Sequence, residues 1–225
     1  MVFKDVSHGL ERGDADHWPD IALYPTHARA EDAYRLSKDY SSLKSLAECR
    51  GPHLARCAYP WMITAIEVKT ESIESGFGFT PDEPLLLKLE GSEDARSKFA
   101  TYAAEIMLRQ HRTHLYMFYI AGSYARMFRW DRNGAIVSYP IDLTEYSELK
   151  VLLNLMYRLI VATPENQGYD TTATLATKDD VAKLLSYETE NVYLQQYHRL
   201  MVDNMGQYPI FKVRVLFASS WYPSQ

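Results

Sequence analysis

Two charged residues at the end of one predicted strand are the pair best suited to chemistry. Residues 63–69 are mostly apolar and β-branched, which predicts a strand that closes with Glu67 and Lys69. Side chains two positions apart in a strand point to the same side of the sheet, so the carboxylate and the amine project together and Val68 points away. The two charges are either solvated where the strand emerges or positioned for a reaction.

A second carboxylate, Asp20, stands at the start of another predicted strand. Residues 18–25 hold a short apolar run bounded by prolines, which is typical of a strand of about five residues. If the two strands meet in one sheet, Asp20, Glu67 and the backbone carbonyl of Val68 offer oxygen ligands to one hard cation, Mg²⁺ or alternatively Mn²⁺. Such a cation activates water and stabilises charge on a phosphate, and Lys69 would orient that water.

The spacing of these residues occurs elsewhere in the chain, so context must separate the copies. A second Glu-x-Lys occurs at residues 148–150 and a second Pro-Asp at residues 81–82. The first falls in a predicted helix, where positions two apart do not share a face, and the second falls in a loop rich in Gly and Pro. Only Asp20 and Glu67 both lie on predicted strands.

The remaining pattern predicts an α/β or α+β fold with a mixed central sheet and helices packed on it. An Asn133-Gly134 dipeptide between two strand-like runs predicts a hairpin with a type I′ turn. We expect one domain over residues 1–225, with a core over about 18–162 and a helical extension with a final strand over 163–225. Residues 1–17 are expected to be irregular and 70–93 to form a loop. The expected helices are 28–48 (one or two), 94–111, 144–161, 178–186 and 190–203, and the further strands are 113–121, 124–130, 135–141 and 209–217.

The composition of the chain indicates the cellular compartment and whether the chain enters a membrane. The 225 residues include only two cysteines, which fits a reducing compartment, and the N-terminus lacks the apolar run of a signal peptide. No stretch approaches the roughly 20 apolar residues of a membrane span. We therefore expect an intracellular protein, cytoplasmic or nuclear, that does not enter a membrane. The sequence does not indicate an oligomeric state.

A local basic cluster stands out in a chain whose formal net charge is −5. The overall charge gives no support for nucleic-acid binding, but a local patch of arginines can grip a phosphate backbone. The alternative is an ordinary solvated face. Gln110 lies on the apolar face of its predicted helix, where it would either reach the catalytic site or make a hydrogen bond at the helix end. The candidate nucleic-acid-binding residues are Arg109, Arg112, Arg129 and Arg132.

About half of the chain, from Trp61 to Asp170, resembles the region that precedes the kinase core in the fungal-type protein kinase family. That region in turn resembles the PD-(D/E)XK, restriction-endonuclease-like nucleases. The resemblance implies a restriction-endonuclease-like fold, with Pro19-Asp20 as the Pro-Asp motif and Glu67-Val68-Lys69 as the E-x-K motif. The residues that carry it are Ile66-Glu67-Val68-Lys69, Gln110-His111-Arg112, the run 128–138 with its Arg-Trp-Asp-Arg-Asn-Gly core, and Gly168-Tyr169-Asp170.

The motifs of a protein kinase core do not occur in these 225 residues. There is no G-x-G-x-x-G before a strand lysine, no His-Arg-Asp loop and no Asp-Phe-Gly. Kinase activity is therefore not expected from these residues. The sequence supports two hypotheses: a Mg²⁺-dependent nuclease-like domain that acts on nucleic acid, with Asp20, Glu67, Lys69 and Gln110 as catalytic residues, or a non-catalytic binding or regulatory module that works with a kinase domain or another protein.

Overall fold

The structure is a computed structural model of the full chain. It describes residues 1–11, 16–38, 40, 53–71, 74–80, 82–203, 205 and 208–214. The chain divides into two compact units, Met1–Tyr169 and Asp170–Gln225. Most of the second half of the predicted helix 28–48, and the last residues of the predicted strand 209–217, lie outside the described residues.

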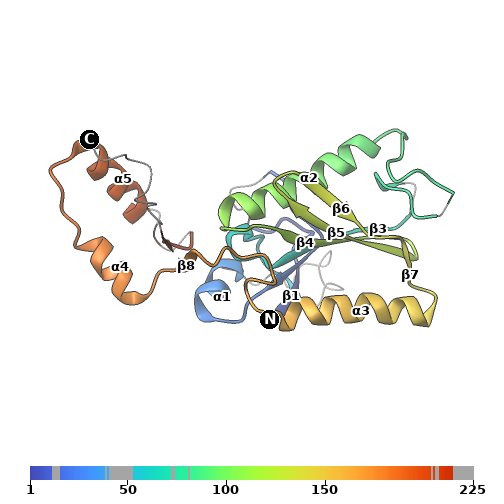
Figure 1. The fold of residues 1–225 in the computed structure, drawn as a ribbon, viewed down its shortest axis with the longest axis horizontal. Coiled ribbons are helices and arrows are strands. Elements are labelled where there is room, and N and C mark those ends of the chain that lie inside the picture. The colour runs from blue at the N-terminus through green and yellow to red at the C-terminus, as the bar shows by residue number, and fades with distance from the viewer. Residues whose placement is uncertain are drawn as a thin grey trace, which may run out of the picture. The chain divides into compact units, whose positions relative to one another are not determined.

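A mixed sheet forms the centre of the first unit, as predicted (Figure 1). Within it, β3 and β4 are parallel and every other neighbouring pair is antiparallel. The parallel pair requires a long crossover connection, which a helix supplies. The strand order is β1 (Val2–Asp5), β2 (Ile21–Tyr24), β3 (Thr64–Lys69), β4 (Leu115–Ala121), β5 (Tyr124–Asp131) and β6 (Gly134–Val137), with β7 (Ile141–Asp142) also paired to β5.

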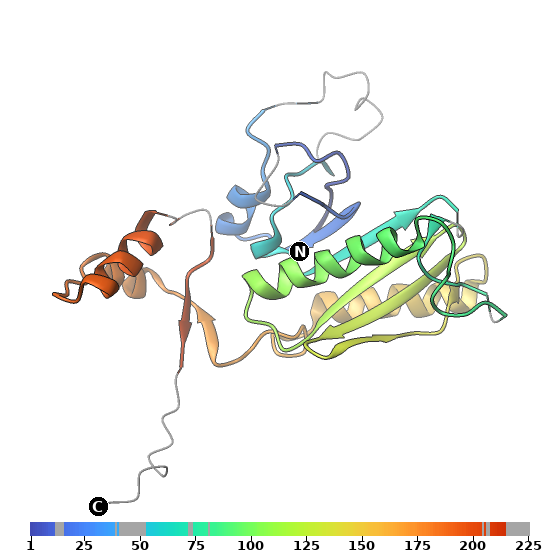
Figure 2. The same cartoon turned by 90° about the horizontal axis from the view of Figure 1, so that it is seen from above.

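Two long helices cover the two faces of this sheet (Figures 1 and 2). The crossover helix α2 (Ser92–Arg109) buries Phe99, Tyr102 and Ile106 against one face, and α3 (Tyr146–Val161) buries Leu152 and Leu159 against the other. Strand β4 serves both layers because its side chains alternate: Leu115, Met117 and Tyr119 join the α2 core, whereas Phe118 joins the α3 core. Two smaller elements, α1 (Ala28–Tyr34) and η3 (Tyr59–Trp61), add Tyr34 and Trp61 to the α2 side.

The second unit contains a two-stranded antiparallel sheet, β8 (Ala173–Leu175) with β9 (Phe211–Val213), and two helices. The helices are α4 (Lys178–Leu185) and α5 (Val192–Asp203). Thr177 begins α4 with a capping box, in which its hydroxyl accepts from the Asp180 N–H and the Asp180 carboxylate accepts from the Thr177 N–H. Neither helix contains a buried residue among those described.

Of the one or two helices predicted over residues 28–48, α1 ends at Tyr34, and most of the rest of that range lies outside the described residues. The structure corrects two sequence predictions. Residues 2–5, predicted to be irregular, form β1, a four-residue edge strand too short to show a clear alternation. The β5–β6 hairpin exists, but Asp131 pairs with Gly134, so the turn residues are Arg132 and Asn133. Neither has a positive φ, so the predicted type I′ turn is wrong; Gly134, with φ of 143°, closes the turn.

Phe99 is the side chain through which α2 is fixed to the sheet. It is fully buried, and its ring contacts those of Phe77, Tyr119, Phe128 and Trp130. We predict that Phe99→Ala lowers the free energy of unfolding by about 3–5 kcal/mol, because the cavity cannot close against four neighbouring rings. Urea unfolding followed by circular dichroism checks this. Leu108→Ala, on the same helix but 80% exposed, should change stability by about 0.5 kcal/mol or less.

Candidate functional site

The antiparallel register of β2 and β3 brings Asp20 and Glu67 together. Ile21 pairs with Ile66, so one step further along the ladder Asp20 stands opposite Glu67. Both side chains lie on the α2 side, because each is two positions from a residue of the α2 core: Ala22 on β2 and Ala65 on β3. Two carboxylates that are 47 positions apart in the sequence are thus neighbours across one strand pair.

Hydrogen bonds tie the acidic pair to the end of β3. The Val68 backbone N–H donates to Asp20 Oδ2 at 2.7 Å, and the Lys69 amine donates to Glu67 Oε1 at 2.6 Å. Lys69 lies on the same side of β3 as Glu67, as its spacing predicts. Among the described residues, no hydrogen bond is made to the other oxygen of each carboxylate, Asp20 Oδ1 and Glu67 Oε2. The pair could therefore accept a further partner on that side.

Burial makes Glu67 electrostatically unusual. The residue is 6% exposed, and loss of hydration raises the pKa of its carboxyl; the hydrogen bond from Lys69 opposes this rise and the neighbouring Asp20 charge adds to it. Burial alone would lower the pKa of Lys69, but its bond to Glu67 and the nearby carboxylates raise that pKa overall. The amine therefore stays charged, and its hydrogen bond and charge favour the ionised form of Glu67.

Three more side chains complete the surroundings of the acidic pair, and the sequence analysis did not identify them. Tyr119 on β4 is the register partner of Glu67 and is fully buried. On α2, the charge of Lys98 lowers the pKa of Glu67, and the charges of Glu67 and Asp20 raise the pKa of Tyr102. Burial, reinforced by the charge of Glu67, raises the pKa of both tyrosines. The spacing of Lys98 and Tyr102, one helical turn apart, is the signal that could have placed them together.

Gln110 is a structural residue in this arrangement. Its side-chain amide donates to the carbonyls of Tyr59 and Met62 at 2.7 and 2.8 Å, and its Oε1 accepts from Arg112. The sequence allowed two roles for Gln110, a hydrogen bond at the helix end or a part in catalysis. The hydrogen bond at the helix end is present. The catalytic role of Gln110 remains a prediction, and these contacts lend it no support.

Arg112, predicted to contact nucleic acid, is 3% exposed. Its guanidinium donates to the carbonyls of Gln167, Met62 and Ile63, and it stacks over the Tyr169 ring at 3.7 Å. Burial lowers the pKa of Arg112, and its interaction with Tyr169 opposes this lowering. Arg112 thus ties the start of β4 to the strand and loop beside it, and it presents no charge to solvent.

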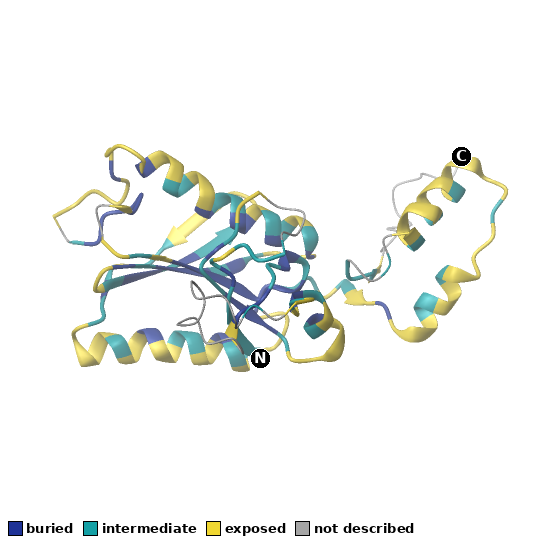
Figure 3. Ribbon diagram, turned by 180° about the vertical axis from the view of Figure 1, so that it is seen from behind, coloured by how far each residue is buried: buried dark blue, intermediate teal, exposed yellow. Residues whose placement is uncertain are grey.

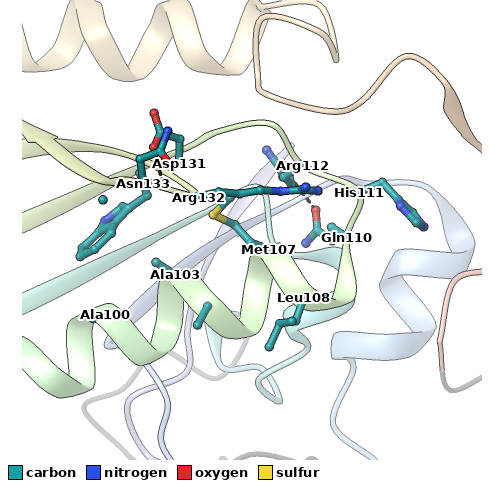
Figure 4. Close-up of a pocket in the computed structure, with 13 residues that line it drawn as sticks. Ala100, Ala103, Met107, Leu108, Gln110, His111, Arg112, Asp131, Arg132 and Asn133 are labelled. Atoms are coloured by element: carbon teal, nitrogen blue, oxygen red, sulfur yellow. Dashed lines mark hydrogen bonds between the residues drawn. The ribbon is translucent and has the colours of Figure 1, made fainter.

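A groove of 790 Å³ lies between α2 and the β5–β6 turn (Figure 4). Arg132 and the buried Arg112 are among its lining residues, whereas Arg109 and Arg129, the other two predicted arginines, are not. Arg132 is exposed and reaches over Met107 toward the segment with Gln110 and Arg112 (Figure 4). Arg109 pairs with Glu105, and Arg129 lies 3.3 Å from Asp131, so both of these positive charges are already partly compensated. Of the four predicted arginines, Arg132 is the one that lines the groove and is exposed.

The groove and the acidic pair occupy different ends of the sheet. Tyr119 marks the level of Glu67 on β4, whereas Trp130 in the groove pairs with Leu115 at the start of that strand. Four residues of strand correspond to about 13 Å. The predicted nucleic-acid-binding arginines and the predicted catalytic carboxylates therefore do not form one continuous site.

The donor set for a cation is two carboxylates and a backbone carbonyl. In the described part of the chain, no group of three or more His, Cys, Asp or Glu side chains is arranged to hold a metal ion. A site at Asp20 and Glu67 would therefore depend on the Val68 carbonyl and on water or substrate oxygens, which is the open type of coordination that Mg²⁺ accepts. None of the helices described here has the length and apolar character of a membrane crossing.

The raised pKa of Glu67 leads to a pH-dependent prediction. The ordinary pKa of a glutamate is 4.5, and that of Glu67 in the folded chain is higher. Between these two pKa values, Glu67 is protonated in the folded chain and ionised in the unfolded chain. The free energy of unfolding should then fall as pH rises through that window, by at most about 1.4 kcal/mol per pH unit. Glu67→Gln lacks this group, so its stability relative to wild type should increase across the window and level off above it.

Urea titrations of both proteins from pH 4 to pH 8 measure this difference. Glu148→Gln, an exposed glutamate in the other Glu-x-Lys, serves as the matched control. If the stability of Glu67→Gln runs parallel to that of wild type at every pH, Glu67 does not have a raised pKa in the fold.

Comparisons with known proteins give one match. The sequence model described as fungal protein kinase matches residues 86–204, just over half of the chain. No curated protein and no solved structure matches. The matched stretch contains all of the groove residues and both long helices of the first unit, whereas Asp20, Glu67 and Lys69 precede it. On the strength of this match, the chain belongs to the fungal protein kinase family.

Proposed function

We propose that the first unit is a PD-(D/E)XK nuclease-like domain that hydrolyses phosphodiesters with the help of Mg²⁺ or Mn²⁺. The observation that carries the proposal is the antiparallel register that sets Asp20 opposite Glu67, with Lys69 on the same side. The resemblance of Pro19-Asp20 and Glu67-Val68-Lys69 to the Pro-Asp and E-x-K motifs supports it. A central mixed sheet with a helical crossover between β3 and β4 is compatible with a restriction-endonuclease-like fold.

The residues have distinct roles in this proposal. Asp20 Oδ1, Glu67 Oε2 and the Val68 carbonyl are the oxygens that would hold the cation. When bound, Mg²⁺ supplies positive charge that polarises the phosphate and acidifies a coordinated water. Lys69, now hydrogen-bonded to Glu67, would turn its amine to orient the attacking water. Lys98, exposed on α2 near Glu67, is suited to bind a phosphate oxygen of the substrate.

A second candidate function is a non-catalytic binding or regulatory module. The groove favours it, because all of its lining residues fall in the stretch that matches the family, and the carboxylates do not. The contacts of Asp20 and Glu67 also have a structural explanation: one carboxylate binds the Val68 N–H and the other pairs with Lys69. In this account the acidic pair completes the end of the β2–β3 ladder, and a partner, such as a kinase domain, binds elsewhere.

Cleavage assays separate the two candidates. Wild-type protein with Mg²⁺ or Mn²⁺ should cleave DNA or RNA, and EDTA should abolish the activity. Lys69→Ala should reduce the rate by at least about 100-fold, the lower range for loss of a group that acts in proton transfer. Asp20→Asn and Glu67→Gln should lose activity together with Mn²⁺ affinity, measured by calorimetry. Glu148→Gln should cleave like wild type.

The outcome that favours the module is equally specific. In that case wild type neither cleaves DNA or RNA nor binds Mn²⁺ more tightly than Asp20→Asn does. Cleavage that survives in Asp20→Asn and Glu67→Gln would also contradict the proposed site, because it would indicate a contaminating nuclease or another centre.

A further inference from the structure

Strand β6 is an edge of the central sheet that lacks the protection of the opposite edge. Within the described part of the chain, β6 pairs with β5 and with no other strand, and three of its four residues are exposed (Figure 3). Its sequence, Gly-Ala-Ile-Val, has no charge and no proline, which are the usual means of keeping an edge strand from pairing. At the opposite edge, β1 carries Lys4 and Asp5, and Leu54 bridges to Asp5.

The register of the β5–β6 hairpin decides which backbone groups of β6 face outward. The Ser138 N–H donates to the Met127 carbonyl at 2.9 Å, so these two opposing residues form a hydrogen-bonded pair. Hydrogen-bonded and non-hydrogen-bonded pairs alternate along an antiparallel ladder, so Val137 and Ala135 belong to pairs of the second kind. Their N–H and C=O groups point away from β5, and no described residue binds them. These groups are the ones that an extended peptide pairs with when it adds to a sheet.

The groove between α2 and the β5–β6 turn lies on the side of the sheet to which Ala135 points. Ala135 pairs with Trp130, which lines the groove, and paired residues project to the same side. Space is also open at Gly134, where an added Cβ would meet no atom within 4 Å. A side chain that enters beside Ala135 would therefore reach the small apolar residues that α2 contributes to the groove: Ala100, Ala103 and Ala104.

Arg132 gives this groove a positive charge. It is exposed, it lines the groove, and it makes no hydrogen bond or ion pair with any described residue. Asp131 is the only carboxylate among the described residues that line the groove, and it is already bound to Arg129 and to the Asn133 N–H. The charge that the groove offers to a ligand is therefore that of a guanidinium, which pairs well with a carboxylate.

We propose that an extended acidic peptide of a partner protein binds as an additional strand on the free edge of β6, antiparallel to it. The peptide residue opposite Ala135 is a large apolar one, and its side chain enters the groove. A Glu or Asp two positions later lies on the same side of the sheet, next to Arg132. Backbone pairing supplies affinity, and the groove with Arg132 selects the order apolar-x-acidic. The proposal does not rest on the nuclease-like function.

The free edge and the charge together favour this occupant over others. A small anion would pair with Arg132 but would leave the β6 backbone groups without partners, and a helix has no free backbone groups along its length to offer them. Pairing of β6 with β6 of a second copy would satisfy the backbone, but that strand contains no carboxylate for Arg132. Strands β8 and β9 contain none either, so the charge does not favour them.

Selection from a phage-displayed library of random heptapeptides, with the full chain as bait, tests the chemistry of the occupant. Wild type should enrich sequences with an acidic residue two positions after a large apolar one. Arg132→Glu should enrich a basic residue at the same place, because it reverses the charge beside the groove. Arg158→Glu makes the same change at an exposed position on α3, and it should select like wild type. Circular dichroism confirms that both variants are folded.

Backbone methylation of a selected peptide tests whether it binds as a strand. The amide of the apolar residue opposite Ala135 faces β6, whereas the amide of the next residue faces away. Methylation of the first amide should weaken binding by at least about tenfold, through the lost hydrogen bond and the bulk of the methyl group. Methylation of the second should change affinity by about twofold or less, because no bond is lost there. Fluorescence polarisation with the labelled peptides measures both.

Four results would overturn the proposal. Absence of any enriched sequence with wild type would show that the edge takes no peptide of this kind. The same acidic preference in wild type and Arg132→Glu would exclude Arg132 as the selecting charge. Equal losses from the two methylated peptides would exclude strand pairing. Self-association of wild type in sedimentation experiments, if it is lost in Ala135→Pro, which removes an outward N–H of β6, would assign the edge to a second copy.

Discussion

The pairing of β3 on both of its edges is the constraint on which the acidic pair depends. On one side β3 runs antiparallel to β2, and this register sets Asp20 opposite Glu67. On the other side it runs parallel to β4, and this register sets Tyr119 beside Glu67. A slip of one residue on either edge would turn the charged side chains to the α3 side. Phe99 and Tyr102 pack α2 against the face of the sheet that carries these side chains.

Burial of Glu67 is costly, and the structure offsets the cost locally. A carboxylate removed from water is stable only when charges or hydrogen bonds replace the lost hydration. Lys69 supplies one such bond, but the raised pKa of Glu67 means that compensation is incomplete. The Asp20 charge beside it increases the deficit. In the proposed function, a divalent cation held by both carboxylates would offset this deficit.

Local sequence patterns predicted most of the helices and strands. Features that depend on contacts between distant segments could not be predicted in the same way. Helix α2 and strands β4 and β5 lie where periodicity indicates, because each pattern is contained within the segment that forms it. The neighbourhood of Asp20 and Glu67 could only be a hypothesis, since the register brings together residues that are 47 positions apart. Arg112 illustrates the opposite failure: a charged residue suggested a surface role, yet three distant carbonyls hold it in the interior.

Membership of the fungal protein kinase family and the acidic pair are separate facts about this chain. The matched stretch begins after β3, so the carboxylates gain no support from it, and the proposed chemistry depends on the β2–β3 register and on the resemblance of the two motifs. The most direct test is to locate Mn²⁺ by anomalous diffraction in crystals of the full chain. The account predicts a peak about 2.1 Å from carboxylate oxygens of both Asp20 and Glu67, close to the Val68 carbonyl. Crystals soaked in Mn²⁺ with Glu67 still bound to Lys69 and no peak between the two carboxylates would contradict it.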